Sequence, residues 1–243
     1  MLKKRIIPVI QYRGMQAVVG RQFNPWRTVG SLRQQVRVYQ ARGVDELFLL
    51  DVAATPEGRG PDFELLKDLC GECFMPVTIG GGIRTVEHIR EALASGADKV
   101  AVGIRHPDNW RLIRAGAEKF GRQAITAIIN HCDDGFPVFK IPGSTARLAL
   151  EVESYGAGEI VLNSVDRDGM QQGYDLATLR DVAKQVSIPV VPLGGAGGYS
   201  HFLEAFEAGA HAVAAGAMFA FSEARPREAA EWLAARGVPT RLD

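Results

Sequence analysis

Two amide side chains stand where two apolar runs of the sequence end. The run RIIPVI leads to Gln11, and the run AITAII leads to Asn130. An amide donates and accepts hydrogen bonds but does not exchange a proton near neutral pH, so neither residue can act as a general acid or base. Two carboxylates occupy comparable places, because Asp51 closes a third run and Asp168 follows a fourth. We expect these four side chains to lie at one active site.

Glycine pairs follow two further apolar runs. Gly81-Gly82 and Gly194-Gly195 each stand between a strand and a helix, and Gly103 and Gly216 end the runs that come next. In such turns backbone N–H groups contact a phosphate at a helix N-terminus. Tight turns that need a positive φ are the alternative explanation. Because the two loops match, we favour a ligand with a phosphate at each end, and the second loop also supplies Gly197.

Eight short apolar runs must position these residues. They span residues 5–10, 46–52, 76–81, 99–103, 124–130, 159–165, 189–195 and 211–216, with amphipathic helical patterns such as 31–43 and 86–97 between them. Nearly continuous apolar runs are typical of parallel strands covered on both faces. The alternation predicts a single (βα)8 barrel domain over residues 1–243, with the site at the carboxyl ends of the strands. A doubly wound open sheet is the alternative, but no GxGxxG follows the first run.

An internal repeat supports two half-barrels. When residues 45–103 are placed on residues 158–216 without a gap, 19 of 59 positions are identical. Glu46 falls on Glu159, Asp62 falls on Asp175, and the two glycine pairs coincide. A repeat of this length corresponds to several strand–helix units.

The composition excludes several classes of protein. Lysine plus arginine and aspartate plus glutamate both number 28, so no surplus charge points to nucleic acid or to a membrane surface. No apolar run approaches the roughly 20 residues of a membrane-spanning helix.

Three cysteines are typical of a reduced cytoplasmic protein. Cys70 and Cys73 have CxxC spacing without a second pair, and the polar stretch 130–135 is typical of a solvated loop, so we expect neither a metal nor a cofactor.

Several longer stretches resemble one known family. They are KKRIIP, DELFLLDVAATPEGR, PVTIGGGIRTVE, GADKVAVG, GAGEIVLNSVDRDG, GYDL, SIPVVPLGGAG and HFLEAFEAGA. Across essentially its whole length the chain is similar to the cyclase subunit of imidazole glycerol phosphate synthase, a (βα)8 barrel. The resemblance implies a separate glutaminase subunit that releases ammonia. In the family, ammonia passes through the barrel and reacts with a bisphosphate substrate derived from a nucleotide.

The chain departs from the family's pattern around the mouth of the barrel. The family's two catalytic aspartates close its first and fifth strands, where this chain has Gln11 and Asn130. Further departures are Val19 for a lysine, Gly103-Ile104 for an asparagine–threonine pair at one phosphate, Asn163 for a threonine, and Ala217 for a serine at the other phosphate. Losing one acid–base group commonly lowers a rate by about 10²- to 10⁴-fold, so we expect little cyclase activity. Asp51 and Asp168 are retained.

The opposite end of the barrel keeps the family's pattern. In the family an arginine, two glutamates and a lysine surround the ammonia entrance, and the matching residues, which we call the charged ring, are Arg5, Glu46, Lys99 and Glu159. The spacing of three of them supports an inward aim, because Arg5, Lys99 and Glu159 share the parity of Gln11, Gly103 and Asn163 at the active-site ends of their own strands. The resemblance also assigns Asp98 to docking of the glutaminase. A structural ion network that plugs the barrel floor is the alternative to an ammonia gate.

The retained floor and the altered mouth predict a paralogue that channels ammonia to a different acceptor. Barrels of this kind without the aspartates are thought to serve the amidination of bacterial surface-polysaccharide sugars. The expected partners are therefore a glutaminase in a heterodimer, a phosphorylated small-molecule or sugar ligand, and a sugar amidotransferase. Two alternatives stay open: a histidine-pathway cyclase with a rearranged site, and a non-catalytic barrel that activates its glutaminase.

Overall fold

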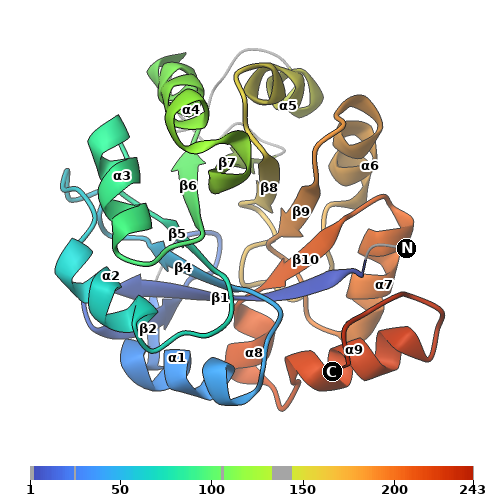
Figure 1. The fold of residues 1–243 in the computed structure, drawn as a ribbon. Coiled ribbons are helices and arrows are strands. Elements are labelled where there is room, and N and C mark those ends of the chain that lie inside the picture. Colours follow the sequence, from blue (N-terminus) through green and yellow to red (C-terminus); the bar gives the residue numbers. More distant parts are fainter. Residues whose placement is uncertain (1–2, 25, 105–106, 133–143, 243) are drawn as a thin grey trace.

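Eight parallel strands form a closed barrel with helices around it (Figure 1). The computed structural model describes residues 3–24, 26–104, 107–132 and 144–242. The barrel strands are β1 (Arg5–Arg13), β4 (Leu47–Asp51), β5 (Val77–Gly80), β6 (Lys99–Gly103), β7 (Ile125–His131), β8 (Glu159–Ser164), β9 (Val190–Leu193) and β10 (Ala212–Ala215). They are hydrogen-bonded in chain order from β1 to β9, and β10 pairs in parallel with β1. The N–H of His211 donates to the carbonyl of Val190 at 3.0 Å, which joins the start of β10 to β9. The predicted (βα)8 barrel is confirmed.

The helices follow the strands and cover the outside of the barrel. They are α1 (Leu32–Ala41), α2 (Phe63–Cys70), α3 (Val86–Ala94), α4 (Pro107–Phe120), α5 (Thr145–Ser154), α6 (Leu176–Gln185), α7 (Tyr199–Glu207), α8 (Ala217–Phe221) and α9 (Pro226–Ala234). A short 3-10 helix (Arg122–Ala124) precedes β7. Sequence patterns did not predict the antiparallel hairpin of β2 (Gln16–Val19) and β3 (Arg27–Ser31), which pairs with the far end of β1. This hairpin extends the first loop above the carboxyl ends of the strands.

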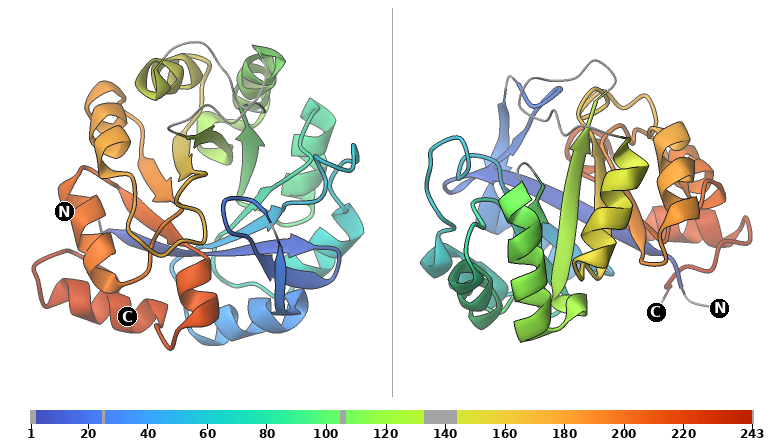
Figure 2. Two further views of the ribbon diagram at one scale, coloured as in Figure 1. Left: turned by 180° about the vertical axis from the view of Figure 1, so that it is seen from behind. Right: turned by 90° about the horizontal axis from the view of Figure 1, so that it is seen from above.

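Each barrel strand buries one face against the helices and the other against the barrel axis. In β1, Ile6 and Ile10 belong to the outer apolar cluster, and Ile7 and Val9 belong to an inner cluster on the axis. The side chains alternate because the strand repeats every two residues. The first inward position of a strand therefore faces the floor of the barrel, and the last faces its mouth. Figure 2 shows both chain termini at the floor end in its right-hand view.

The internal repeat is visible in the way helices begin. The side chain of Asp62 accepts a hydrogen bond from the N–H of Leu65 at the start of α2, and Asp175 accepts one from the N–H of Thr178 at the start of α6. Each bond satisfies an N–H that has no partner inside its helix. The two aspartates coincide in the repeat, so matching residues do the same work in the two halves. Within the described residues, no helix is long and apolar enough to span a membrane.

The outer cluster should carry most of the stability of the fold. Phe202 is fully buried and contacts the rings of Tyr174, Tyr199 and Phe219. We expect Phe202→Ala to lower the free energy of unfolding by roughly 3–5 kcal/mol, because it leaves a cavity. Phe74 is 90% exposed, and Phe74→Ala is the control, with an expected change within about 0.5 kcal/mol. Urea unfolding of both variants measures the difference, and equal losses would contradict this assignment of the core.

Candidate functional site

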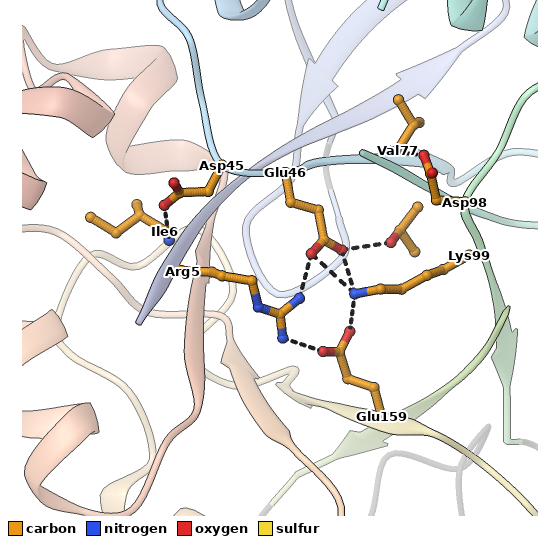
Figure 3. Close-up of polar contacts among 9 residues, drawn as sticks. Arg5, Ile6, Asp45, Glu46, Val77, Asp98, Lys99 and Glu159 are labelled. Carbon is orange, nitrogen blue, oxygen red and sulfur yellow. Dashed lines mark hydrogen bonds and ion pairs between the residues drawn. The ribbon is translucent and has the colours of Figure 1, made fainter. Parts of the chain in front are cut away.

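Four charged side chains meet at the floor of the barrel and pair with one another (Figure 3). Arg5 donates to Glu46 through Nη1 and to Glu159 through Nη2. Lys99 Nζ lies 3.0 Å from both carboxylate oxygens of Glu46 and 3.0 Å from Glu159 Oε1. Thr78 Oγ1 also donates to Glu46 Oε1, at 2.8 Å. Each carboxylate of the charged ring is therefore held by both cations, and the ring closes on itself.

Burial explains why the charges of the ring occur together. Glu46 is 3% exposed and Glu159 is 7% exposed, and an unpaired carboxylate at such a position costs several kcal/mol. Burial opposes ionisation of Glu46, but Lys99 and Arg5 outweigh it and hold the pKa of Glu46 below its usual value. Burial likewise opposes the charge on Arg5, and the two glutamates raise its pKa. The ring has two positive and two negative members and no net charge.

Two further carboxylates lie at the same end of the barrel. Asp98 is exposed beside Lys99, and its Oδ2 accepts a hydrogen bond from the N–H of Val77 at 2.8 Å. Asp45 accepts one from the N–H of Ile6 at 3.1 Å. Both bonds fix the first residues of barrel strands around the ring, as Figure 3 shows. The roles given to Asp98 and to the ring, docking of a glutaminase and passage of ammonia, stay predictions.

A cavity of about 380 Å³ opens at the mouth, at the other end of the barrel axis. Gln11, Asn130 and Asn163 line it with amides, and Phe23 and Trp26 of the first loop line it with aromatic rings. Its other lining residues are Leu50, Asp51, Val52, Thr55, Pro56, Gly81, Gly82, Ile83, Arg84, Ala101, Gly103, Asn109 and Ile128. The cavity thus combines hydrogen-bonding groups, an aromatic wall and the cation of Arg84. Ala101 and Ile128 lie deep on the inner face of the barrel, so the cavity reaches down toward the floor.

The two amides that stand at the family's aspartate positions are already engaged. The side chain of Gln11 donates to the carboxyl group of Asp168. Asn163 Nδ2 donates to Asn130 Oδ1 at 2.9 Å. Gln11 therefore turns its N–H toward Asp168 and leaves its oxygen as an acceptor, and Asn130 leaves its amide N–H as a donor. The amides offer hydrogen-bonding groups to the cavity, and neither has a group that exchanges a proton near neutral pH.

Asp168 sits behind the cavity wall and differs from an ordinary carboxylate. It is 6% exposed, and besides Gln11 its side chain accepts a hydrogen bond from the N–H of Phe23. Its Oδ2 is buried without a hydrogen-bond partner among the described residues. Burial raises the pKa of Asp168 to about 7, although the two hydrogen bonds oppose the shift. Asp168 does not line the cavity, so its predicted catalytic role stays a prediction and its visible work is to hold Gln11 and the first loop.

The retained Asp51 is occupied by protein partners. Its Oδ1 accepts from the N–H groups of Ala53 and Ala54 at 3.0 and 3.1 Å. Arg59 lies 3.1 Å from the same oxygen and 2.8 Å from Oδ2. A carboxylate with four such bonds holds the β4–α2 loop in place.

The two predicted phosphate sites differ in their access to the cavity. Gly81, Gly82 and Gly103 of the first site line it, and Ile104 of the same site is buried beside it. Gly194, Gly195, Gly197, Gly216 and Ala217 of the second site do not line it. Both glycine pairs have positive φ, and a Cβ at Gly81 or Gly194 would come within 2.2 Å of Asp51 O or 2.5 Å of Ser164 O. Close contact with the neighbouring loop therefore explains these glycines without a ligand, and phosphate binding stays a prediction.

The first loop covers the side of the mouth near the second glycine pair. The N–H of Gln22 donates to the carbonyl of Asp168, and Gln22 Nε2 donates to the carbonyl of Asp166, both at 2.9 Å. A Cβ at Gly169 would lie 2.0 Å from the carbonyl of Gly20, so the two loops touch directly. Gln22 and Phe23 have φ of 51° and 68°, which side chains rarely adopt. The contact with the β8–α6 loop holds this strained segment over the mouth.

Sequence patterns missed several residues of the site. Arg84 and Asn109 enter the cavity from the turn after β5 and from the first turn of α4, and Thr78 supports the charged ring. The position of Arg84 directly after the glycines of IGGGIRT was the available signal. Cys70 and Cys73 are free thiols, and the described residues contain no group of three His, Cys, Asp or Glu side chains with metal-site geometry. Residues 133–135 of the loop considered for a metal lie outside the described residues.

Asp168 should make the stability of the protein depend on pH. A buried Asp168 keeps its proton to about pH 7, whereas the unfolded chain loses it near 3.8. The folded state therefore binds more protons between these values, and this residue's contribution to stability falls as pH rises from about 4 to 7. Across this range, the free energy of unfolding of the wild type should fall by on the order of 2–4 kcal/mol relative to that of Asp168→Asn. Urea unfolding at several pH values tests this, with the exposed Asp181→Asn as control; a pH-independent difference would contradict it.

Comparison with known proteins agrees with this architecture. Residues 5–225 match the family model described as "Histidine biosynthesis protein". The chain is 40% identical, over an alignment 248 positions long, to "Putative imidazole glycerol phosphate synthase subunit hisF2" of Campylobacter jejuni, and all of both chains is covered. It is also 40% identical, over an alignment 254 positions long, to "Imidazole glycerol phosphate synthase subunit HisF" of Caulobacter vibrioides, with all of this chain and 98% of that protein covered. The chain therefore belongs to the histidine biosynthesis protein family and is a HisF-like barrel.

Proposed function

We propose that this HisF-like barrel conducts ammonia from a glutaminase on its floor to an acceptor at its mouth, as a subunit of a glutamine-dependent amidotransferase. The observation that carries the proposal is the contrast between the two ends of the barrel. The charged ring at the floor is complete and fully paired. The mouth has amides at Gln11 and Asn130, where the family's cyclase reaction needs acid–base groups.

The floor has the features of an entrance for a small molecule. Side-chain exposures of 29% for Arg5 and 19% for Lys99 leave the ring accessible from the floor side. Asp98 is exposed next to Lys99 and supplies a charge for a partner protein. Because all the ion pairs of the ring are formed, ammonia can pass only if at least one of them breaks. A partner protein bound to the floor is in a position to break it. The relatives are named as subunits of a synthase, which supports an assembly with a second protein.

The mouth suits a phosphorylated small molecule or a sugar. Arg84 brings a cation to the side lined by Gly81 and Gly82, and its guanidinium is fixed by the carbonyl of Gly58 at 2.9 Å. Arg59 pairs with the carboxylate of Asp51 and also with that of Glu57, and its charge weakens the repulsion between Asp51 and an anion. Trp26 and Phe23 offer flat apolar faces to a ring. We place the complex in the cytoplasm, where the thiols of its three cysteines stay reduced.

The acceptor is the most specific part of the proposal. We assign it to a surface-polysaccharide sugar that a sugar amidotransferase converts to an amidine, because the mouth retains hydrogen-bonding amides without an acid–base pair. A histidine-pathway cyclase with a rearranged site is the second candidate, supported by the 40% identity to HisF of Caulobacter vibrioides. A barrel that only activates its glutaminase is the third. Genes for sugar nucleotides or for histidine beside this one would separate the first two.

The isolated barrel should not perform the family's cyclase reaction. With ammonium salts and the family's bisphosphate substrate, we expect a rate at least about 10²- to 10⁴-fold below that of a cyclase with both aspartates. The double variant Gln11→Asp/Asn130→Asp should recover little, because a carboxylate at position 11 cannot donate to Asp168 as the amide does. The turnover rates of both proteins are measured by the change in absorbance of the substrate. A wild-type rate close to that of a family cyclase would sink this part of the proposal.

Lys99→Ala separates an ammonia gate from a structural plug. Without Lys99, two carboxylates face Arg5 alone, so we expect the ring to open. The free energy of unfolding should fall by roughly 1–3 kcal/mol. This loss is smaller than for a fully buried ion pair because the cations of the ring are partly exposed. A gate predicts that the variant still binds the proposed glutaminase partner but alters its rate of glutamine hydrolysis severalfold. Calorimetric titration and glutamate formation measure these properties, with the exposed Lys184→Ala as control.

A plug would lower stability and leave glutamine hydrolysis by the complex unchanged. If the glutaminase neither binds the wild-type barrel nor responds to it, the ammonia-conducting function itself fails.

A further inference from the structure

One polar side chain lies between the charged ring and the mouth with no role in either. Thr126 on β7 is 0% exposed, and its Oγ1 has no hydrogen-bond partner among the described residues. It shares the inward parity of Ile128 and Asn130, which line the cavity, whereas Ile125 and Ala127 pack in the outer cluster. The hydroxyl therefore belongs to the inner face of the barrel. An unpaired hydroxyl in such a place costs stability, and valine has nearly the same shape without that cost.

The strand register places Thr126 between the two ends of the proposed path. On one side Thr126 is the register partner of Glu159 on β8, a member of the charged ring. On the other side it is the register partner of Ala101 on β6, which lines the cavity. Ala101 in turn lies two residues beyond Lys99, the ring's cation on the same strand. The neighbour of Thr126 on β8 is therefore a member of the charged ring, and its neighbour on β6 belongs to the wall of the cavity.

The surroundings of Thr126 on the axis are apolar. The inner cluster of the barrel consists of Ile7, Val9, Phe48, Ala101, Ile128, Val161, Val191, Leu193, Ala212 and Ala214, with Leu50 against it. Such walls disfavour a charged ammonium ion and tolerate a neutral molecule. A small polar molecule that leaves the ring would meet no hydrogen-bonding side chain among these residues before the amides of the mouth. Thr126 interrupts this apolar stretch.

We infer that Thr126 is a binding site for neutral ammonia in transit from the charged ring to the cavity. Ammonia has three N–H donors and one lone pair, and a hydroxyl both donates and accepts, so the pair is complementary. The site holds the molecule after it has left the ring's charges and before it reaches Gln11 and Asn130. This assignment rests on the proposed function for its direction of flow, and on the unpaired hydroxyl and the register for its place.

The first experiment uses the barrel alone and compares Thr126→Val with wild type. We expect the urea midpoint of Thr126→Val to equal or exceed that of wild type, because valine has nearly the same shape and the hydroxyl has no hydrogen bond to another described protein group to lose. Thr240→Val is the matched control: Thr240 is buried off the axis and its Oγ1 donates to the carbonyl of Ala230 at 2.8 Å, so its midpoint should fall. A clear loss of stability in Thr126→Val would show that the hydroxyl has a structural partner and would overturn the site.

High-resolution crystal structures of the same proteins show whether a small molecule binds at Thr126. Grown with and without ammonium chloride, wild-type crystals should show a density peak within hydrogen-bond distance of Thr126 Oγ1, from water or ammonia, and Thr126→Val crystals should lack it. A hydroxyl that donates to a main-chain carbonyl with no peak beside it would overturn the inference. This result does not depend on any partner protein, so it judges the site even if the proposed function fails.

The second experiment measures transport in the complex with the proposed glutaminase. Neutral ammonia, in equilibrium with ¹⁵N-labelled ammonium in solution, should enter the mouth, pass the barrel and replace the amide nitrogen of glutamine in the glutaminase, which mass spectrometry detects. Loss of one hydrogen bond should lower the ratio of exchange to hydrolysis about three- to tenfold in Thr126→Val, and Thr126→Ser should retain it. An unchanged ratio in Thr126→Val would overturn the role in transit. Absence of a complex would count against the proposed function instead.

Discussion

The charged ring is the constraint on which the rest of this barrel depends. Four ionised side chains in a closed barrel are tolerated only if they neutralise one another, since each alone would cost several kcal/mol. The ring meets this condition through contacts that join the first residues of β1, β6 and β8 to Glu46, the residue just before β4. The ring therefore fixes the register at the floor, and the period of two along each strand then determines which residues reach the mouth.

The mouth is organised by hydrogen bonds from neutral groups. Gln11 is turned by Asp168, and Asn130 is turned by Asn163. The same Asp168 holds the first loop through Gln22 and Phe23, so the orientation of the amide and the cover over the cavity are coupled through one buried residue. A mouth of this kind has the groups to orient a ligand and lacks an acid–base pair at positions 11 and 130. Together with a complete floor, it fits a barrel that delivers ammonia and leaves the chemistry of the acceptor elsewhere.

Sequence patterns predicted the eight barrel strands, the repeat and the inward aim of the ring, because buried parallel strands and a period of two leave a strong signal. They did not predict the β2–β3 hairpin, whose short strands pair only with the end of β1. They also missed the bond between Gln11 and Asp168, which joins residues from opposite halves of the chain. The cavity opens beside Gly81 and not beside Gly194 because the first loop docks on the β8–α6 loop, and a tertiary contact of this kind has no local signature.

A structure of the barrel bound to its proposed glutaminase partner tests the central claim most directly. The account predicts that the glutaminase sits on the floor, with its active site facing Arg5, Glu46, Lys99 and Glu159 and with Asp98 inside the interface. It also predicts that at least one ion pair of the ring is rearranged relative to the closed ring of the isolated barrel. A glutaminase bound at the mouth or against the outer helices, with the ring unchanged, would contradict it.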